Sequence, residues 1–206
     1  AEPGWPAPVI LGVELLQQLV EEMDTAASPT DLARHRKVMT SFRDTVLFTV
    51  FDQALNMLNG IKTKQIIISV PEKESALTVA LLNLANLCLS FDFLGTNSDE
   101  SSDDTRTAQL PSHWRDKVVA EATMQMFYEL YMTLKAPFSA QAMSCLVQLA
   151  SARRTLFSNV QRTDYLRRLV FYIKEVLRSS HGLDNAENYH EFCRLLARLK
   201  TNFQLA

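Results

Sequence analysis

The chain has 206 residues, of which 47% are apolar and 21% are charged, with a formal net charge of −2. This composition excludes a disordered chain, a collagen-like repeat and a strongly basic nucleic-acid-binding protein. Only 5 glycines and 7 prolines are present, fewer turn residues than a β-sandwich or an α/β enzyme of this size needs. The composition therefore favours long helices with few connections.

Charge is distributed unevenly along the chain. Residues 1–104 hold 7 basic and 15 acidic side chains, whereas residues 105–206 hold 14 basic and 8 acidic ones. Such asymmetry can steer charged partners, although solvated helix faces would produce the same pattern.

The cysteines and the apolar runs indicate a reducing compartment. Three widely spaced cysteines, Cys88, Cys145 and Cys193, form no disulfide framework. No secretory leader opens the chain, and the most apolar stretch, 76–91, is too short to cross a bilayer. We therefore expect no membrane partner. Because the sequence begins without Met, we expect a piece of a longer protein.

Apolar residues follow helical spacing almost throughout. The spacing and the turn residues predict helices at about 8–23, 41–60, 71–90, 123–134 and 139–156. A further helix is predicted between the box at 158–161 and Gly182, with an apolar stripe of Leu166, Leu169, Val170, Ile173 and Leu177. The last predicted helix follows the box at 184–187 and carries Phe192, Leu195, Leu196, Leu199 and Phe203. Gly60 and Gly182 are expected to close two of them. Capping boxes are predicted at 69–72 and 158–161, with an acidic version at 184–187. Residues 91–113 are predicted to be a loop, 66–68 a short linker, and no strand is expected.

A short motif recurs in the predicted helices. Residues 80–85 match 145–150 and, more loosely, 193–197, at spacings of 65 and 48 residues. Without an insert of about 23 residues, the first spacing approaches the ~40–47-residue period of HEAT repeats. We predict an all-α fold: an α-solenoid of antiparallel helix pairs, stacked as a right-handed superhelix. Residues 1–206 would be a single segment of about three and a half repeats with an acidic insert at 91–113. A four-helix bundle is the alternative.

Four runs carry a resemblance to a known family. They are FDFLGT at 91–96, Leu110-Pro111 with Trp114-Arg115, SCLVQLASARR at 144–154, and NYHEFCRLLARLK at 188–200. The chain resembles the exportin-seven family of the importin-β superfamily over about residues 30–206, and more weakly over 9–29. The resemblance implies an internal segment of a HEAT-repeat nuclear transport receptor, following the N-terminal Ran-binding repeats.

The resemblance also implies partners and a location. Such karyopherins bind Ran in its GTP form, protein cargo and nuclear pore components, and shuttle between nucleus and cytoplasm. It implies stoichiometric binding with no enzyme activity, no cofactor and no nucleic-acid partner. The alternative is a HEAT or armadillo scaffold without Ran dependence. An enzyme would need a site that the sequence lacks, because His190 and Cys193 have no further metal ligands or orienting acid at a usable spacing.

The first candidate site is the acidic insert. Asp99, Glu100, Asp103 and Asp104 place four carboxylates within six residues, and their repulsion favours exposure. Karyopherins use acidic inserts to contact Ran or cargo, so the resemblance implies docking onto a basic patch. A solvated loop without a partner is the alternative. Ser101 precedes Asp104 by three residues, a pattern that acidic-directed kinases phosphorylate.

The second candidate site is basic. Arg153 and Arg154 are predicted to end one helix, and Arg194 and Arg198 lie on the last one. They would line a concave face and bind an acidic partner. Alternatively, they would interact favourably with the helix dipole and form local ion pairs with residues such as Glu191. Trp114 and Tyr189 are expected to pack between repeats, and Cys193 to be a buried thiol.

Overall fold

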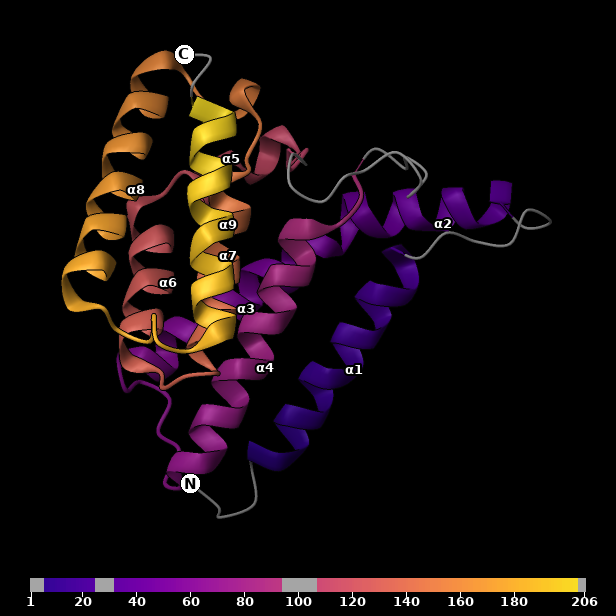
Figure 1. The fold of residues 1–206 in the computed structure, drawn as a ribbon. Helices are drawn as coiled ribbons and strands as arrows, with labels where there is room; N and C mark the ends of the chain where they lie inside the picture. Colours follow the sequence, from indigo (N-terminus) through magenta and orange to yellow (C-terminus); the bar gives the residue numbers. More distant parts are fainter. Residues whose placement is uncertain (1–5, 25–31, 94–106, 204–206) are drawn as a thin grey trace. The chain divides into compact units, whose positions relative to one another are not determined.

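The computed structural model describes residues 6–24, 32–93 and 107–203 (Figure 1). Within these ranges the regular elements are helices, and the β-type pairing is one isolated bridge between Ala108 and Ala152. The predicted all-α class is therefore confirmed. The chain divides into two compact units, residues 1–99 and 100–206, which are described separately.

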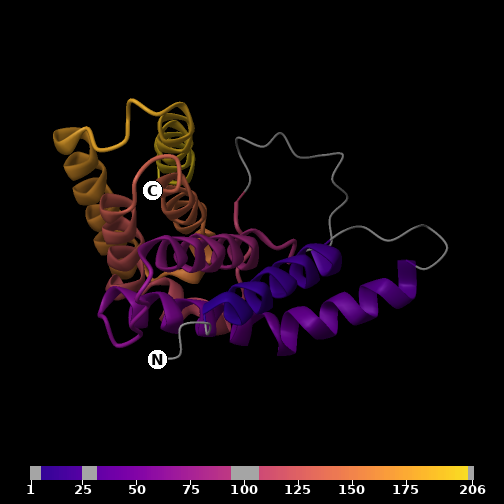
Figure 2. The same cartoon turned by 90° about the horizontal axis from the view of Figure 1, so that it is seen from below.

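The first unit contains helices α1 (Pro6–Asp24), α2 (Leu32–Thr45), α3 (Leu47–Lys62) and α4 (Pro71–Ser90). Helices α3 and α4 form a hairpin, and α1 lies along α4 (Figures 1 and 2). The Gln17 side chain donates to the Ala80 carbonyl at 2.6 Å, and the Asp92 N–H donates to Asp24 at 2.7 Å. These two contacts show that α1 and α4 run parallel.

The predicted helix at 41–60 is wrong at both ends. Helix α2 begins at Leu32, the chain bends at Val46, and α3 continues to Lys62. Gly60 lies inside α3, where an added Cβ would come within 2.8 Å of Ile66 Cδ1. This glycine permits close packing of the following linker, a role that local sequence does not distinguish from a helix stop.

The two predicted capping boxes have opposite outcomes. Helix α4 begins after Val70 with Pro71 in its first turn, and no side chain caps it, so the predicted box at 69–72 is wrong. At α8, Ser158 accepts from the Gln161 N–H while the Gln161 side chain accepts from the Ser158 N–H. That box is confirmed.

The described part of the second unit, residues 107–203, holds four long helices and three short ones. The long helices are α6 (Glu121–Thr133), α7 (Ser139–Ala150), α8 (Asn159–Ser179) and α9 (Ala186–Phe203). The short ones are η3 (Ser112–Trp114), α5 (Arg115–Val118) and η4 (Arg154–Leu156). Helix α6 packs against α7, α6 contacts α8, and α7 packs along α9 (Figure 1).

Helices α7 and α9 run parallel, as α1 and α4 do. Asn188 near the start of α9 bonds to Ser139 at the start of α7, and Asn202 near the end of α9 donates to the Ala150 carbonyl. The repeated motif lies on α4, α7 and α9, which supports a HEAT-like arrangement of helix pairs. The right-handed superhelix and the count of three and a half repeats remain predictions.

Helix α7 ends at Ala150, six residues before its predicted end. The Ala108 N–H donates to the Ser151 carbonyl at 2.8 Å, and the Arg153 N–H donates to the Ala108 carbonyl at 3.1 Å. Because these bonds hold residues 151–153 beside Ala108, the chain leaves the helical conformation after Ala150. Because Ala108 is remote in sequence, apolar spacing within the helix cannot reveal this stop.

A buried polar clamp joins the α8–α9 connection to α6 and α7. Tyr131 donates to the His181 carbonyl, and the fully buried Asn188 donates to both Ser139 and the Gly182 carbonyl. Gly182 has φ +69°, and an added Cβ would lie 2.3 Å from Asn188 Nδ2. Helix α8 ends at Ser179 because Ser180 adopts the left-handed conformation, with φ +52°, and Gly182 serves the clamp instead of closing the helix.

Helix α9 is capped by Asn185, one residue after the predicted Asp184. The Asn185 side chain accepts from the Glu187 and Asn188 N–H groups at 3.1 and 3.2 Å. The acidic box predicted at 184–187 is therefore replaced by an asparagine cap.

Candidate binding surfaces

The predicted acidic site lies outside the described residues. Asp99, Glu100, Asp103 and Asp104 fall between residues 93 and 107, together with the candidate phosphorylation site Ser101. Docking of these carboxylates on a basic partner remains a proposal.

The two predicted arginines of α9 have different environments. Arg194 makes two bonds to Glu191, at 2.9 and 3.1 Å, which is the local ion pair expected from an i, i+3 spacing. Arg198 is 6% exposed and lies on the buried face with Phe192 and Leu195. Arg194 is thus engaged with its own helix, and Arg198 points to the core side.

The two other predicted arginines follow the end of α7. Arg153 is half-buried, and its Nε is enclosed without a hydrogen-bond partner among the described residues. Arg154 opens η4 and is exposed. The structure therefore places this pair in an irregular turn instead of a last helical turn.

Sequence reasoning missed Arg162. The predicted stripe of α8 includes Val170 and Leu177, but these are 38% and 53% exposed. The buried face runs instead through Arg162, Tyr165, Leu169, Ile173 and Val176. Four of these five residues are apolar or aromatic at helical spacing, a signal that could have placed Arg162 inside. Burial lowers the pKa of Arg162, and the nearby charge of Arg154 lowers it further.

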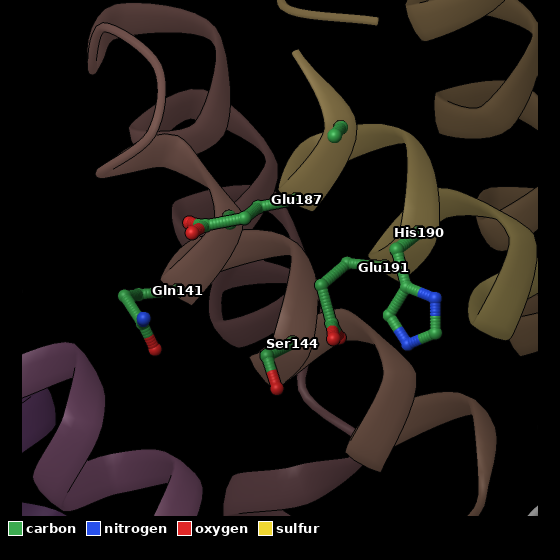
Figure 3. A pocket seen from close by; sticks show the side chains of 7 residues that line it. Gln141, Ser144, Glu187, His190 and Glu191 are labelled. Carbon is green, nitrogen blue, oxygen red and sulfur yellow. The ribbon is translucent and has the colours of Figure 1, made fainter.

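A hollow opens between α7 and α9 (Figure 3). It has a volume of about 480 Å³ and is lined by Ala140, Gln141, Ser144, Ala186, Glu187, His190 and Glu191. Glu187 and Glu191 reach from α9 toward α7, where Gln141 and Ser144 lie. The lining carries two carboxylates and no lysine or arginine. Glu191 is already paired with Arg194, so Glu187 is the carboxylate with which the α7–α9 groove can receive a basic side chain of a protein partner.

The cysteines do not assemble a reactive or metal-binding centre in the described residues. No group of three or more His, Cys, Asp or Glu side chains there could hold a metal ion. Burial raises the pKa of the Cys88 thiol to about 12, which keeps it protonated at neutral pH. Cys145 is also buried, but Cys193 is exposed, so its predicted burial is wrong.

The two predicted packing anchors differ. Trp114 is fully buried, as expected, whereas Tyr189 is 58% exposed. Tyr189 therefore does not pack within the described structure, and its contact with a neighbouring repeat stays a prediction. The described helices also include none that is both long and apolar enough to cross a bilayer.

Comparisons with known proteins identify close relatives. Exportin-7-B and Exportin-7-A of Xenopus laevis are each 44% identical to this chain over 196 residues, which is 95% of the chain. Ran-binding protein 16 of Drosophila melanogaster is 42% identical over 199 residues. This chain is homologous to a segment of exportin-7. The resemblance seen in the sequence motifs is thereby confirmed.

The match covers a small part of each relative. The chain spans 18% of the length of the curated exportin-7 relatives that it matches. No protein-family model and no solved structure matches the chain.

Proposed function

We propose that the chain is a segment of a nuclear transport receptor of the exportin-7 type. Its parent protein would bind Ran in its GTP form, protein cargo and nuclear pore components, and would shuttle between nucleus and cytoplasm. The observation that carries this proposal is 42–44% identity across 95% of the chain to proteins named as exportins and Ran-binding proteins.

The segment would act by binding, not by catalysis. Stacked helix pairs offer an extended surface whose curvature can change, so two partners can be coupled through their affinities for different conformations. Under this proposal no cofactor takes part, and nucleotide hydrolysis on Ran resets the receptor. The transport direction and the cargo are left open by the relatives' names.

The α7–α9 groove would meet a basic side chain of the cargo. Its hollow of about 480 Å³ is large enough for one side chain, and the carboxylate of Glu187 gives the charge complementarity, because Glu191 is paired with Arg194. The acidic residues Asp99, Glu100, Asp103 and Asp104 would contact a basic partner, and Arg153 and Arg154 an acidic one.

The test is a binding experiment on the full-length parent protein. Immobilised parent is incubated with Ran loaded with GTP or with GDP, and the bound Ran is quantified. The proposal expects strong preference for the GTP form. Equal or absent binding to both forms would contradict it and would favour a scaffold without Ran dependence.

The groove is tested by charge reversal in the same protein. Glu187→Lys places a positive charge at the rim and is expected to weaken capture of a basic cargo about tenfold. Glu175→Lys, on α8, is the matched control and leaves capture unchanged. If both variants bind alike, the groove does not contact cargo, although the Ran test can still succeed.

A further inference from the structure

The outer side of α8 carries a stripe of exposed cations with one aromatic ring among them. Arg167, Phe171, Lys174 and Arg178 are all exposed and follow the helical spacing i, i+4, i+7 and i+11. Each is two residues from a residue of the buried face, such as Leu169, and positions two apart lie on nearly opposite sides of an α-helix. The four side chains therefore share one face. We call them the outer stripe of α8.

Exposed apolar side chains gather on and beside this stripe. Phe171 is 57% exposed, and Val160 lies on the same side of the helix and is 73% exposed. Val170 and Leu177 border the stripe and are 38% and 53% exposed. Exposed apolar surface bordered by charges is typical of an interaction site, and aromatic residues and arginine are enriched in protein interfaces. The outer stripe is therefore a candidate contact surface for another protein.

The charge of α8 indicates which kind of partner fits. The helix carries five basic residues and two acidic ones, an excess of three positive charges. Both carboxylates bond within the helix, Asp164 to Arg167 at 3.1 Å and Glu175 to Arg178 at 2.7 Å. Exposed pairs of this kind are weak because water screens both charges, so carboxylates of a partner can replace them. Charge complementarity therefore favours an acidic partner.

The two other arginines of α8 are directed to neighbouring segments. Arg162 is buried and donates to the Asn202 carbonyl. Arg168 is half-buried and donates to the Val119 carbonyl at 3.4 Å. The cations that α8 offers to a partner are therefore those of the outer stripe.

We propose that the outer stripe of α8 binds an acidic segment of a partner protein. Carboxylates of that segment pair with Arg167, Lys174 and Arg178, and an apolar side chain of the same segment covers Phe171. The charges attract the segment, and the ring selects segments that also carry an apolar side chain. This surface lies on α8, whereas the groove proposed for a basic side chain lies between α7 and α9. The two proposals can therefore fail independently.

Binding of a labelled peptide to the 206-residue chain, followed by fluorescence anisotropy at low salt, tests the role of charge. The probe is a synthetic peptide made of repeats of Glu-Leu-Asp-Gly. Lys174→Glu is expected to weaken its binding about fivefold, because an attraction becomes a repulsion. Lys135→Glu, at an exposed position between α6 and α7, is the matched control and leaves binding unchanged.

A second peptide, in which serine replaces each leucine, tests the role of the ring. Phe171→Ser is expected to weaken binding of the leucine peptide about fivefold and to leave binding of the serine peptide unchanged. Phe138→Ser changes a ring that is 51% exposed between α6 and α7, and as the matched control it affects neither peptide. Helical circular dichroism should be the same for every variant, because all the changed side chains are exposed.

Four results would overturn the proposal. The first is an equal effect of Lys174→Glu and Lys135→Glu on the leucine peptide, and the second is an equal effect of Phe171→Ser on both peptides. The third is a dimer of the chain that Phe171→Ser dissociates, because the stripe would then join two copies. The fourth is binding to vesicles of phosphatidylserine and phosphatidylcholine without binding to the leucine peptide, which would make the stripe a membrane contact.

Discussion

The two ends of the α7–α9 pair differ in whether their buried polar side chains are fully hydrogen-bonded. At the amino ends, Asn188 is fully buried and its side chain bonds to both Ser139 and the Gly182 carbonyl. At the carboxyl ends, Arg162 is buried with two donors unmatched among the described residues. A satisfied buried network stabilises one structure, whereas buried donors without acceptors cost folding free energy.

The largest expected effect on stability is at the amino ends of α7 and α9, where Asn188 is fully hydrogen-bonded. Asn188→Ala removes the amide that joins α7, α9 and the connecting turn, and leaves Ser139 and the Gly182 carbonyl with fewer partners. We expect a loss of about 2–4 kcal/mol in the free energy of unfolding, measured by urea denaturation. Gln125→Ala, exposed on α6, should change it by less than about 0.5 kcal/mol. Equal effects would mean that the clamp is not a stabilising network.

A second prediction concerns the hydroxyl that completes the clamp. Tyr131→Phe removes the bond to the His181 carbonyl while keeping the buried ring, and should cost about 1 kcal/mol. The measurement is again urea denaturation at neutral pH. A cost near that of Asn188→Ala would show that the two residues act as one unit.

The same tyrosine gives a pH dependence. Burial, and secondarily the charge of Asp184, raises the pKa of Tyr131 from 10.0 to about 12. The unfolded chain therefore loses this proton before the folded one does. The contribution of Tyr131 to stability is full below pH 10 and is lost as the pH rises toward 12. Subtracting the pH profile of Tyr131→Phe from that of the parent chain isolates this decline, and identical profiles would contradict it.

At the carboxyl end, a substitution of Arg162 should raise the free energy of unfolding instead of lowering it. Arg162→Met replaces a buried charge with an apolar side chain of similar length, and such replacements are neutral or stabilising. We expect a gain of about 1 kcal/mol in the free energy of unfolding, measured by urea denaturation. A clear loss would show that the guanidinium of Arg162 has a stabilising partner.

The last prediction concerns the reactivity of the cysteine thiols, which should leave the fold unchanged. Cys193 is exposed on α9 between the two ends, whereas Cys88 and Cys145 are buried. A thiol reagent should modify Cys193 in the folded chain without loss of helical circular dichroism, and the other two only after unfolding. Modification of Cys88 in the folded chain would contradict its burial and its raised pKa of about 12.

Much of the candidate site could not be predicted from the sequence. Arg194 and Arg198 follow the same helical spacing, yet one pairs with Glu191 and the other is buried, because a neighbouring helix covers only one side of α9. The α7–α9 groove combines residues 49 positions apart, such as Gln141 and His190. Its lining depends on which helices pack together, and apolar spacing does not specify that choice.

The sequence by itself determined the helical class, the approximate position of most helices and the relationship to exportin-7. The helical class and the helix positions follow from local quantities: 3.6-residue spacing, the cap at Ser158 and a motif that recurs on α4, α7 and α9. The relationship to exportin-7 follows from the resemblance of particular runs, such as 144–154 and 188–200. The tertiary structure alone decided that Gly60 and Gly182 serve packing, that Ala108 ends α7, and that Arg162 is buried. Each depends on a contact with another segment, so the physical cause lies outside the local window that a sequence pattern describes.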